Sequence, residues 1–144
     1  MCLQIDKKYT REYKRKHHGE TIEVIKGLRI YKSIEDYKSY NSYRLVGPYQ
    51  KNFTYQKGIN AAYIPFYFPL EYLFGDIYHG LHVFFSMTGF DGYFSSFDGK
   101  VHAIKFSAHV NDLIGISKYK DTAVFKKLYL DDKECERIYT LQGQ

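Results

Sequence analysis

The fold is decided by the stretch Gly80-Leu81-His82-Val83-Phe84-Phe85-Ser86. Both faces of this stretch are mostly apolar, which is typical of a strand that lies in the middle of a sheet and is covered on both sides. We therefore take residues 80–86 as a central strand and interpret the rest of the chain outward from it.

Short strands are predicted on both sides of this stretch. Residues 101–107 alternate cleanly, with Ile104 and Phe106 on one face, as in a strand with one buried side. Residues 61–68 form an apolar run that Pro65 interrupts, which suits an edge strand or an extended loop. Further strands are expected at residues 21–26, 28–32, 51–55, 111–116 and 123–130.

Helices are predicted to be few and short. A helix is expected from Ser33 to about residue 40, and a charged helical start at residues 131–137. Residues 88–100 contain three glycines and suit a long loop or a short distorted helix. No crossover helix of ten or more residues separates the strands, which argues against a parallel sheet. We expect an α+β fold with a small mixed or mainly antiparallel sheet of five to seven short strands and one or two short helices.

Charge divides the chain into two parts. The 144 residues carry a formal net charge of +5, and residues 7–18 account for all of it. We expect a basic N-terminal arm at residues 1–19 and one globular domain at residues 20–144. The arm either contacts an acidic surface or nucleic acid, or is a solvated segment that aids solubility. Its cationic residues are Lys7, Lys8, Arg11, Lys14, Arg15 and Lys16.

Chemistry-bearing motifs are missing from the sequence. Neither a phosphate-binding glycine loop, a nucleophile elbow nor a paired-histidine zinc motif occurs. Two cysteines, Cys2 and Cys135, cannot form a disulfide scaffold, which favours a reducing compartment. The apolar runs are too short to span a membrane. We therefore expect no catalytic residue, no metal and no cofactor, and for His82 a core position outweighs a catalytic one.

A family resemblance is carried by four short motifs: Ile30-Tyr31-Lys32, Gly47-Pro48-Tyr49-Gln50, Phe53-x-Tyr55-x-x-Gly58 and Gly80-Leu81-His82-Val83-Phe84. These motifs resemble a set of small uncharacterised proteins encoded by phages, bacteria and large DNA viruses, many of which begin Met-Cys-Leu, as here. The resemblance implies a viral or mobile-element protein, located in a virion or in the host cytoplasm. The chain departs from it at residues 88–100, where the relatives tend to have an alanine-bearing helix.

The same order of motifs is also loosely similar to ADP-ribosyltransferase-like folds. Those enzymes use a late catalytic glutamate, and here the nearest one, Glu134, lies beyond the end of the late strand. A carboxylate that could stabilise charge is missing at that place. This resemblance therefore implies a degenerate enzyme.

Sixteen tyrosines, eleven phenylalanines and no tryptophan favour half-buried rings that work at contacts. Our first hypothesis is a non-enzymatic viral structural or interaction protein, such as a minor capsid component, that contacts other viral proteins or itself through tyrosine-rich surfaces and the basic arm. The alternative is a small ligand-binding protein that captures a nucleotide of host defence. Its candidate contacts are Tyr31, Tyr49, Tyr55, His82 and Lys105.

Overall fold

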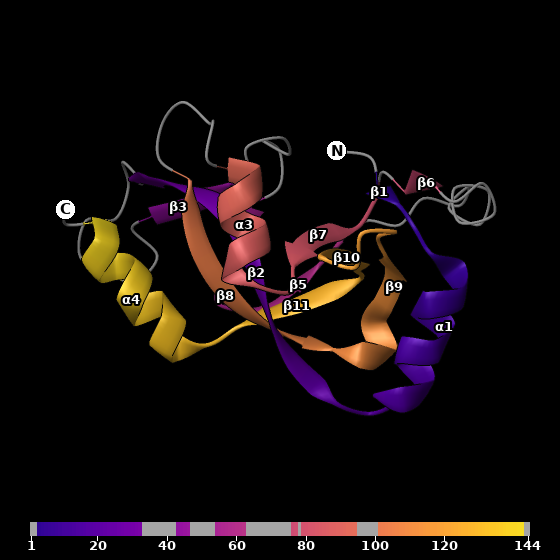
Figure 1. Cartoon of the computed structure of the whole chain (residues 1–144). Coiled ribbons are helices and arrows are strands. Elements are labelled where there is room, and N and C mark those ends of the chain that lie inside the picture. Colours follow the sequence, from indigo (N-terminus) through magenta and orange to yellow (C-terminus); the bar gives the residue numbers. More distant parts are fainter. Residues whose placement is uncertain are drawn as a thin grey trace.

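The computed structural model describes residues 3–32, 43–46, 54–62, 76–77, 79–94 and 101–142 (Figure 1). Two of the expected elements, residues 33–40 and nearly all of residues 61–68, lie outside the described residues. In chain order the elements are β1 (Leu3–Gln4), α1 (Lys7–Lys16), β2 (Thr21–Lys32), β3 (Tyr43–Val46), β4 (Thr54–Tyr55), β5 (Gly58–Ala61), β6 (Asp76–Ile77), β7 (Leu81–Phe84), α3 (Met87–Phe94), β8 (His102–His109), the 3-10 turn η1 (Val110–Asp112), β9 (Leu113–Ile116), β10 (Thr122–Phe125), β11 (Lys127–Leu130) and α4 (Asp132–Gln142).

One antiparallel sheet organises the chain. Its strands follow the order β5-β11-β8-β2-β7-β10-β9, and β3 joins the outer half of β2 and pairs in turn with β4. The long strand β2 pairs with β8 over residues 21–28 and with β3 over residues 29–32. The α+β class with a mainly antiparallel sheet is therefore confirmed, and β7 lies inside the sheet with all four residues buried, as expected.

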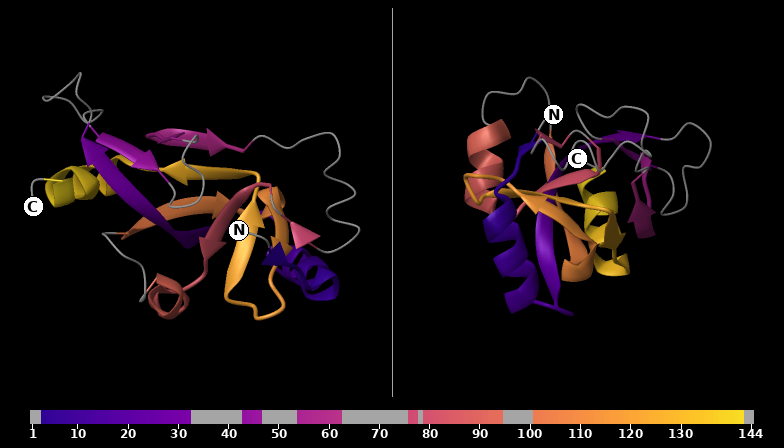
Figure 2. Two further views of the ribbon diagram at one scale, coloured as in Figure 1. Left: turned by 90° about the horizontal axis from the view of Figure 1, so that it is seen from above. Right: turned by 90° about the vertical axis from the view of Figure 1, so that its right-hand side faces the viewer.

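The two faces of β2 enter different apolar clusters, because successive side chains of a strand point to opposite sides. Val24 and Leu28 belong to the main core, which also takes in buried side chains from β7, β8, β10, β11 and α4. Ile25 points the other way and packs with Phe84 and Phe90 beneath α3. Helices α1 and α4 lie at opposite ends of the molecule (Figure 2).

Three local differences from the sequence interpretation have clear physical causes. Gly27 does not divide two strands, because β2 runs through it. A Cβ at this position would come within 2.5 Å of the Phe94 ring. The glycine therefore lets α3 pack closely against β2. Residues 123–130 form two strands, β10 and β11, which separate at Lys126, whose backbone N–H donates to Asp112 O at 2.9 Å. Residues 87–94 form the helix α3, the second of the two possibilities for that region.

Candidate functional site

The basic segment at the N-terminus forms helix α1, which is fixed to the sheet. Asp6 caps the helix by accepting a hydrogen bond from Tyr9 N at 2.9 Å. Thr10 is buried; its hydroxyl donates to Asp6 O at 2.7 Å and accepts from Ile116 N of β9 at 3.0 Å. The described residues 3–19 thus form a short strand followed by a helix that is docked on the sheet, and the backbone that carries the cations has a fixed position.

The inner side of α1 carries aromatic rings toward the core. Tyr9 and Tyr13 pack against the main cluster, and the ring centroid of Tyr13 lies 5.9 Å from that of Phe85. Sequence reasoning missed this helix, although Asp6 as a cap and the spacing of Tyr9, Tyr13 and His17 were visible signals.

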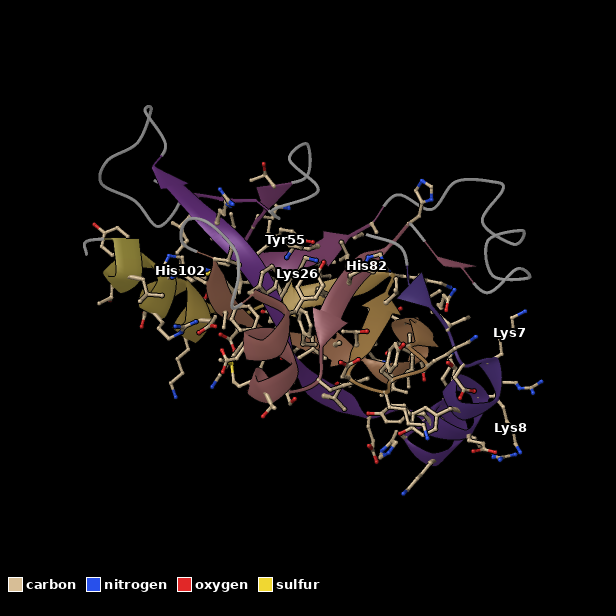
Figure 3. The ribbon with its side chains drawn as sticks, turned by 45° about the horizontal axis from the view of Figure 1, so that its top comes forward. Lys7, Lys8, Lys26, Tyr55, His82 and His102 are labelled. Carbon is tan, nitrogen blue, oxygen red and sulfur yellow. The ribbon has the colours of Figure 1, made fainter. Side chains whose placement is uncertain are left out.

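The outer side of α1 is a cluster of positive charge centred on Arg11. Residues three and four positions apart are neighbours on a helix surface. All four such neighbours of Arg11 are cationic, namely Lys7, Lys8, Lys14 and Arg15. Lys7 and Lys8 project from the helix in Figure 3. Among the described residues no carboxylate forms an ion pair with Lys8, Arg11 or Arg15. The one acidic residue within α1, Glu12, is a helix neighbour of Lys8 and Arg15 but not of Arg11, so the repulsion around Arg11 is only partly offset within the helix.

The turn between β9 and β10 places two further lysines beside the start of α1. Lys118 N donates to Gln4 O at 3.1 Å, beside the start of α1. The Lys120 ammonium lies 4.6 Å from the ring centroid of Tyr9, a cation–π contact. Between the two lysines, Tyr119 is 89% exposed. We use the name basic face for the cations of α1 together with those of this adjacent turn: Lys7, Lys8, Arg11, Lys14, Arg15, Lys16, Lys118 and Lys120.

Hydrogen bonds hold this turn in one shape. Lys120 N donates to Ser117 O at 2.9 Å, and Ser117 N donates to Thr122 O at 2.9 Å. The Ser117 hydroxyl donates to the Asp121 carboxylate at 3.2 Å. Lys120 adopts a φ of 63°, a left-handed conformation that is uncommon for a residue with a side chain. The exposed ring of Tyr119 therefore stands on a constrained support.

A second unusual cation lies inside the protein. Lys26 occupies the core face of β2 between Val24 and Leu28 and is buried. Its ammonium group donates to His82 O at 2.7 Å and lies 5.5 Å from the ring centroid of Tyr55 (Figure 3). Burial lowers the pKa of Lys26 from 10.5 to about 7, because the interior disfavours the charged form.

The five candidate ligand contacts are not all brought together. Tyr55 and His82 are buried, at 2% and 9% exposure, but only the Tyr55 ring and the backbone carbonyl of His82 lie beside Lys26; the His82 side chain is on the opposite face of β7 from Leu81 and Val83. Lys105 is exposed on the other face of β8, since its neighbours Ile104 and Phe106 are in the core. The backbone of Tyr31 belongs to β2, but its side chain lies outside the described residues, as does Tyr49 entirely.

Glu134, the late glutamate, holds α4 against β8. Its carboxylate accepts from Lys105 N at 2.6 Å and from the Arg137 guanidinium at 2.9 Å. Arg137 also donates to Ala103 O at 2.8 Å. Burial alone would raise the pKa of Glu134, but the hydrogen bonds from Arg137 and from Lys105 N outweigh it and lower the pKa. Both carboxylate oxygens are engaged in this structural contact.

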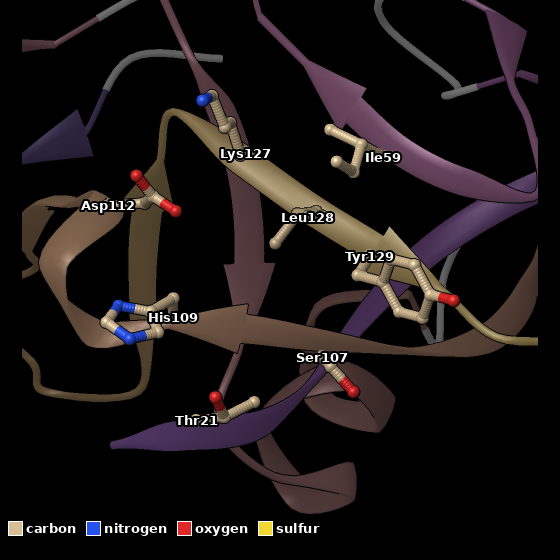
Figure 4. Close-up of a pocket in the computed structure, with 8 residues that line it drawn as sticks. All are labelled: Thr21, Ile59, Ser107, His109, Asp112, Lys127, Leu128 and Tyr129. Atoms are coloured by element: carbon tan, nitrogen blue, oxygen red, sulfur yellow. The ribbon is translucent and has the colours of Figure 1, made fainter. Parts of the chain in front are cut away.

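A groove of about 400 Å³ lies on the outer face of the sheet, lined by residues of β2, β5, β8, η1 and β11 (Figure 4). Sequence reasoning did not identify it, because its wall combines residues far apart in the chain. Ser107 and His109 both line the groove. In a hydrolase a serine nucleophile is activated by a histidine that accepts its proton, so we asked whether His109 could be such a base. The Nδ1 atom of His109 accepts from Asn111 N at 3.2 Å. The neutral ring then carries its proton on Nε2, so that nitrogen is a donor and not a general base.

Comparison with protein-family models, curated proteins and solved structures gives no match for this chain. Within the described ranges, no three histidine, cysteine, aspartate or glutamate side chains gather where they could hold a metal ion. The described helices are all too short or too polar to cross a membrane.

Proposed function

We propose that this protein is a non-enzymatic interaction protein that binds nucleic acid through the basic face. The observation that carries the proposal is Arg11 with four cationic neighbours on a helix whose other side is fixed to the body. Like charges at these spacings destabilise a helix by roughly 0.2–0.5 kcal/mol per pair. A bound anionic partner would be attracted to each of these cations and would screen their repulsion of one another.

Nucleic acid fits this surface better than a membrane does. A helix that lies in a membrane interface buries its apolar side among the lipids. In α1 the apolar side, with Tyr9 and Tyr13, is already packed against the protein core. What remains for a partner is charge, which suits a row of phosphates.

Nucleic acid also fits better than an acidic protein surface. Specific protein interfaces have a core depleted of charged residues and enriched in apolar and aromatic ones. On α1 the outward residues are instead charged, with Lys8, Arg11, Arg15 and Lys16 exposed. A regularly charged polymer matches them without needing an apolar centre.

The resemblance to small viral proteins supplies the setting of the proposal. There the protein would be a minor component of a virion or of the infected cytoplasm, with nucleic acid or a nucleic-acid-bound protein as its partner. Mass spectrometry of purified particles checks the virion part, and absence of the chain from particles would restrict the proposal to the cytoplasm.

Charge reversal on α1 tests the binding. With a fluorescent 20-nucleotide DNA and anisotropy at 50–200 mM NaCl, we expect the pair Arg11→Glu and Arg15→Glu to weaken binding at least about tenfold and to lower the salt dependence by about two ions. The matched control is the pair Lys126→Glu and Lys127→Glu, with the same change of charge on exposed residues of another surface. Equal loss in both pairs, or no binding by the wild-type protein, would overturn the proposal.

A further inference from the structure

We infer that the ligand of the basic face is single-stranded nucleic acid, and that Tyr119 stacks on one of its bases. This inference rests on the proposed function and adds the form of the ligand and the residue that selects it. It is carried by an observation separate from the charge of α1, namely the exposure and support of the Tyr119 ring.

Tyr119 is the most exposed of the large hydrophobic side chains in the described part of the chain, at 89%. Aromatic rings usually bury most of their surface, because the ring is apolar. The turn that carries Tyr119 is closed by the hydrogen bonds of Ser117 and Lys120 and tied to Gln4, so the ring is presented by a fixed backbone. Because the backbone of the turn is already ordered, covering the ring with a flat partner costs only the rotamer freedom of one side chain.

The charges beside Tyr119 fit the backbone of a stacked nucleotide. Lys118 and Lys120 flank the ring in sequence, and both side chains are exposed. Lys120 is oriented by its contact with the Tyr9 ring, at 4.6 Å, which links the turn to α1. Proteins that bind single strands combine aromatic rings for the bases with cations for the phosphates. The turn and α1 together supply both.

A duplex would leave the Tyr119 ring without a partner. In duplex nucleic acid the base faces are already stacked on one another, and the outer surface is phosphate and sugar. A single strand offers free base faces to an exposed ring. The ring is also poorly suited to be the centre of a protein interface, because its neighbours Lys118, Lys120 and Asp121 are charged and exposed.

The experiment compares single-stranded and duplex ligands on a set of tyrosine variants. Anisotropy is measured with a labelled 15-nucleotide oligothymidylate and with a 15-base-pair duplex at 100 mM NaCl. We expect the single strand to bind at least about tenfold more tightly. Tyr119→Ala should weaken single-strand binding by about 5- to 150-fold and Tyr119→Phe by less than about threefold, because stacking needs the ring and not the hydroxyl.

Two readouts separate stacking from charge. Tyr119→Ala should leave the salt dependence of binding unchanged, whereas Arg11→Glu with Arg15→Glu lowers it. The matched control is Tyr129→Ala on β11, a tyrosine that is 49% exposed on another part of the surface, and it should bind like the wild-type protein. Circular dichroism verifies that each variant keeps its fold.

The results that would contradict this inference differ from those that would contradict the proposed function. If the duplex binds as tightly as the single strand, or if Tyr119→Ala binds normally while the charge-reversed pair does not, this inference falls and the proposed function stands. If the wild-type protein binds neither oligonucleotide, both fall. Tighter binding to phosphatidylserine vesicles than to either oligonucleotide also overturns both.

Discussion

The exposed cations of α1 and the buried Lys26 of β2 show how differently the protein tolerates positive charge at its surface and in its interior. Around Arg11, cations repel one another but remain in water, where each repulsion is small and salt screens it. For Lys26 the shift is caused by burial and not by neighbouring cations, and it lowers the pKa to about 7. The comparison teaches that solvent access decides the cost of a charge more than the number of like charges nearby.

The two regions also differ in what they can contribute. The cations of the basic face are solvent-exposed or partly exposed, so their charge is accessible from outside the protein. Lys26 is shielded between strands, and its described partners are the His82 carbonyl and the Tyr55 ring. Near neutral pH its amine is poised between two protonation states, so this region makes the stability of the fold depend on pH.

The largest expected effect comes from removing the buried charge. Between pH 7 and pH 10 the unfolded chain binds a proton at Lys26, with its ordinary pKa of 10.5, that the folded protein does not bind. The stability of the folded state therefore rises with pH across this window. Relative to Lys26→Met, which cannot titrate, we expect the free energy of unfolding of the wild-type protein to rise by about 1.4 kcal/mol per pH unit. Urea unfolding from pH 6 to pH 10 measures it.

The control for this prediction is Lys127→Met, which makes the same substitution at an exposed site of β11. It should change the free energy of unfolding by no more than about 0.5 kcal/mol at every pH. Parallel pH profiles for the wild-type protein and Lys26→Met would show that Lys26 keeps an ordinary pKa and would break the comparison.

Most of the fold could be predicted because its signals are local. The apolar stretch around Val83 and the alternation around Ile104 mark strands wherever their partners lie. What could not be predicted depends on distant residues. Gly27 resembles a strand break until Phe94 is seen to occupy the space above it, and residues 123–130 resemble one strand until Lys126 is seen to bond to Asp112.

The candidate site was predicted in part. The cations of residues 7–16 were evident from composition, but their fixed position depends on the contact of Thr10 with β9, more than a hundred residues away in sequence. Lys26 was missed although it interrupts the apolar alternation of Val24 and Leu28, since a lysine there is read as the end of a strand. Tyr119 was missed because exposure follows from tertiary packing and leaves no mark in sequence.

An intermediate effect should follow from loosening α1 without changing its charge. Thr10→Val keeps the shape of the side chain but leaves the buried N–H of Ile116 without its acceptor. We expect a loss of about 1–3 kcal/mol in the free energy of unfolding, equal at pH 7 and pH 9 because no titrating group is removed. Urea unfolding at both pH values measures it.

Thr10→Ser retains both hydrogen bonds and serves as the control, with a change below about 1 kcal/mol. If Thr10→Val proves as stable as the wild-type protein, α1 is not anchored by this contact. Its cations would then lose the fixed arrangement on which the comparison with Lys26 depends.

The smallest expected effect is that of removing the charge of Arg11. The sign of the change in the free energy of unfolding shows whether this charge stabilises the fold or is retained for binding. Arg11→Gln removes repulsion from four cationic neighbours, so we expect the free energy of unfolding to rise by about 1 kcal/mol at 20 mM NaCl and the gain to vanish at 1 M NaCl. Arg137→Gln, the same substitution at an arginine paired with Glu134, should instead lower it. A charge that costs stability and strengthens nucleic-acid binding is maintained for a partner, whereas a loss of stability in Arg11→Gln would mean that the charge serves the fold.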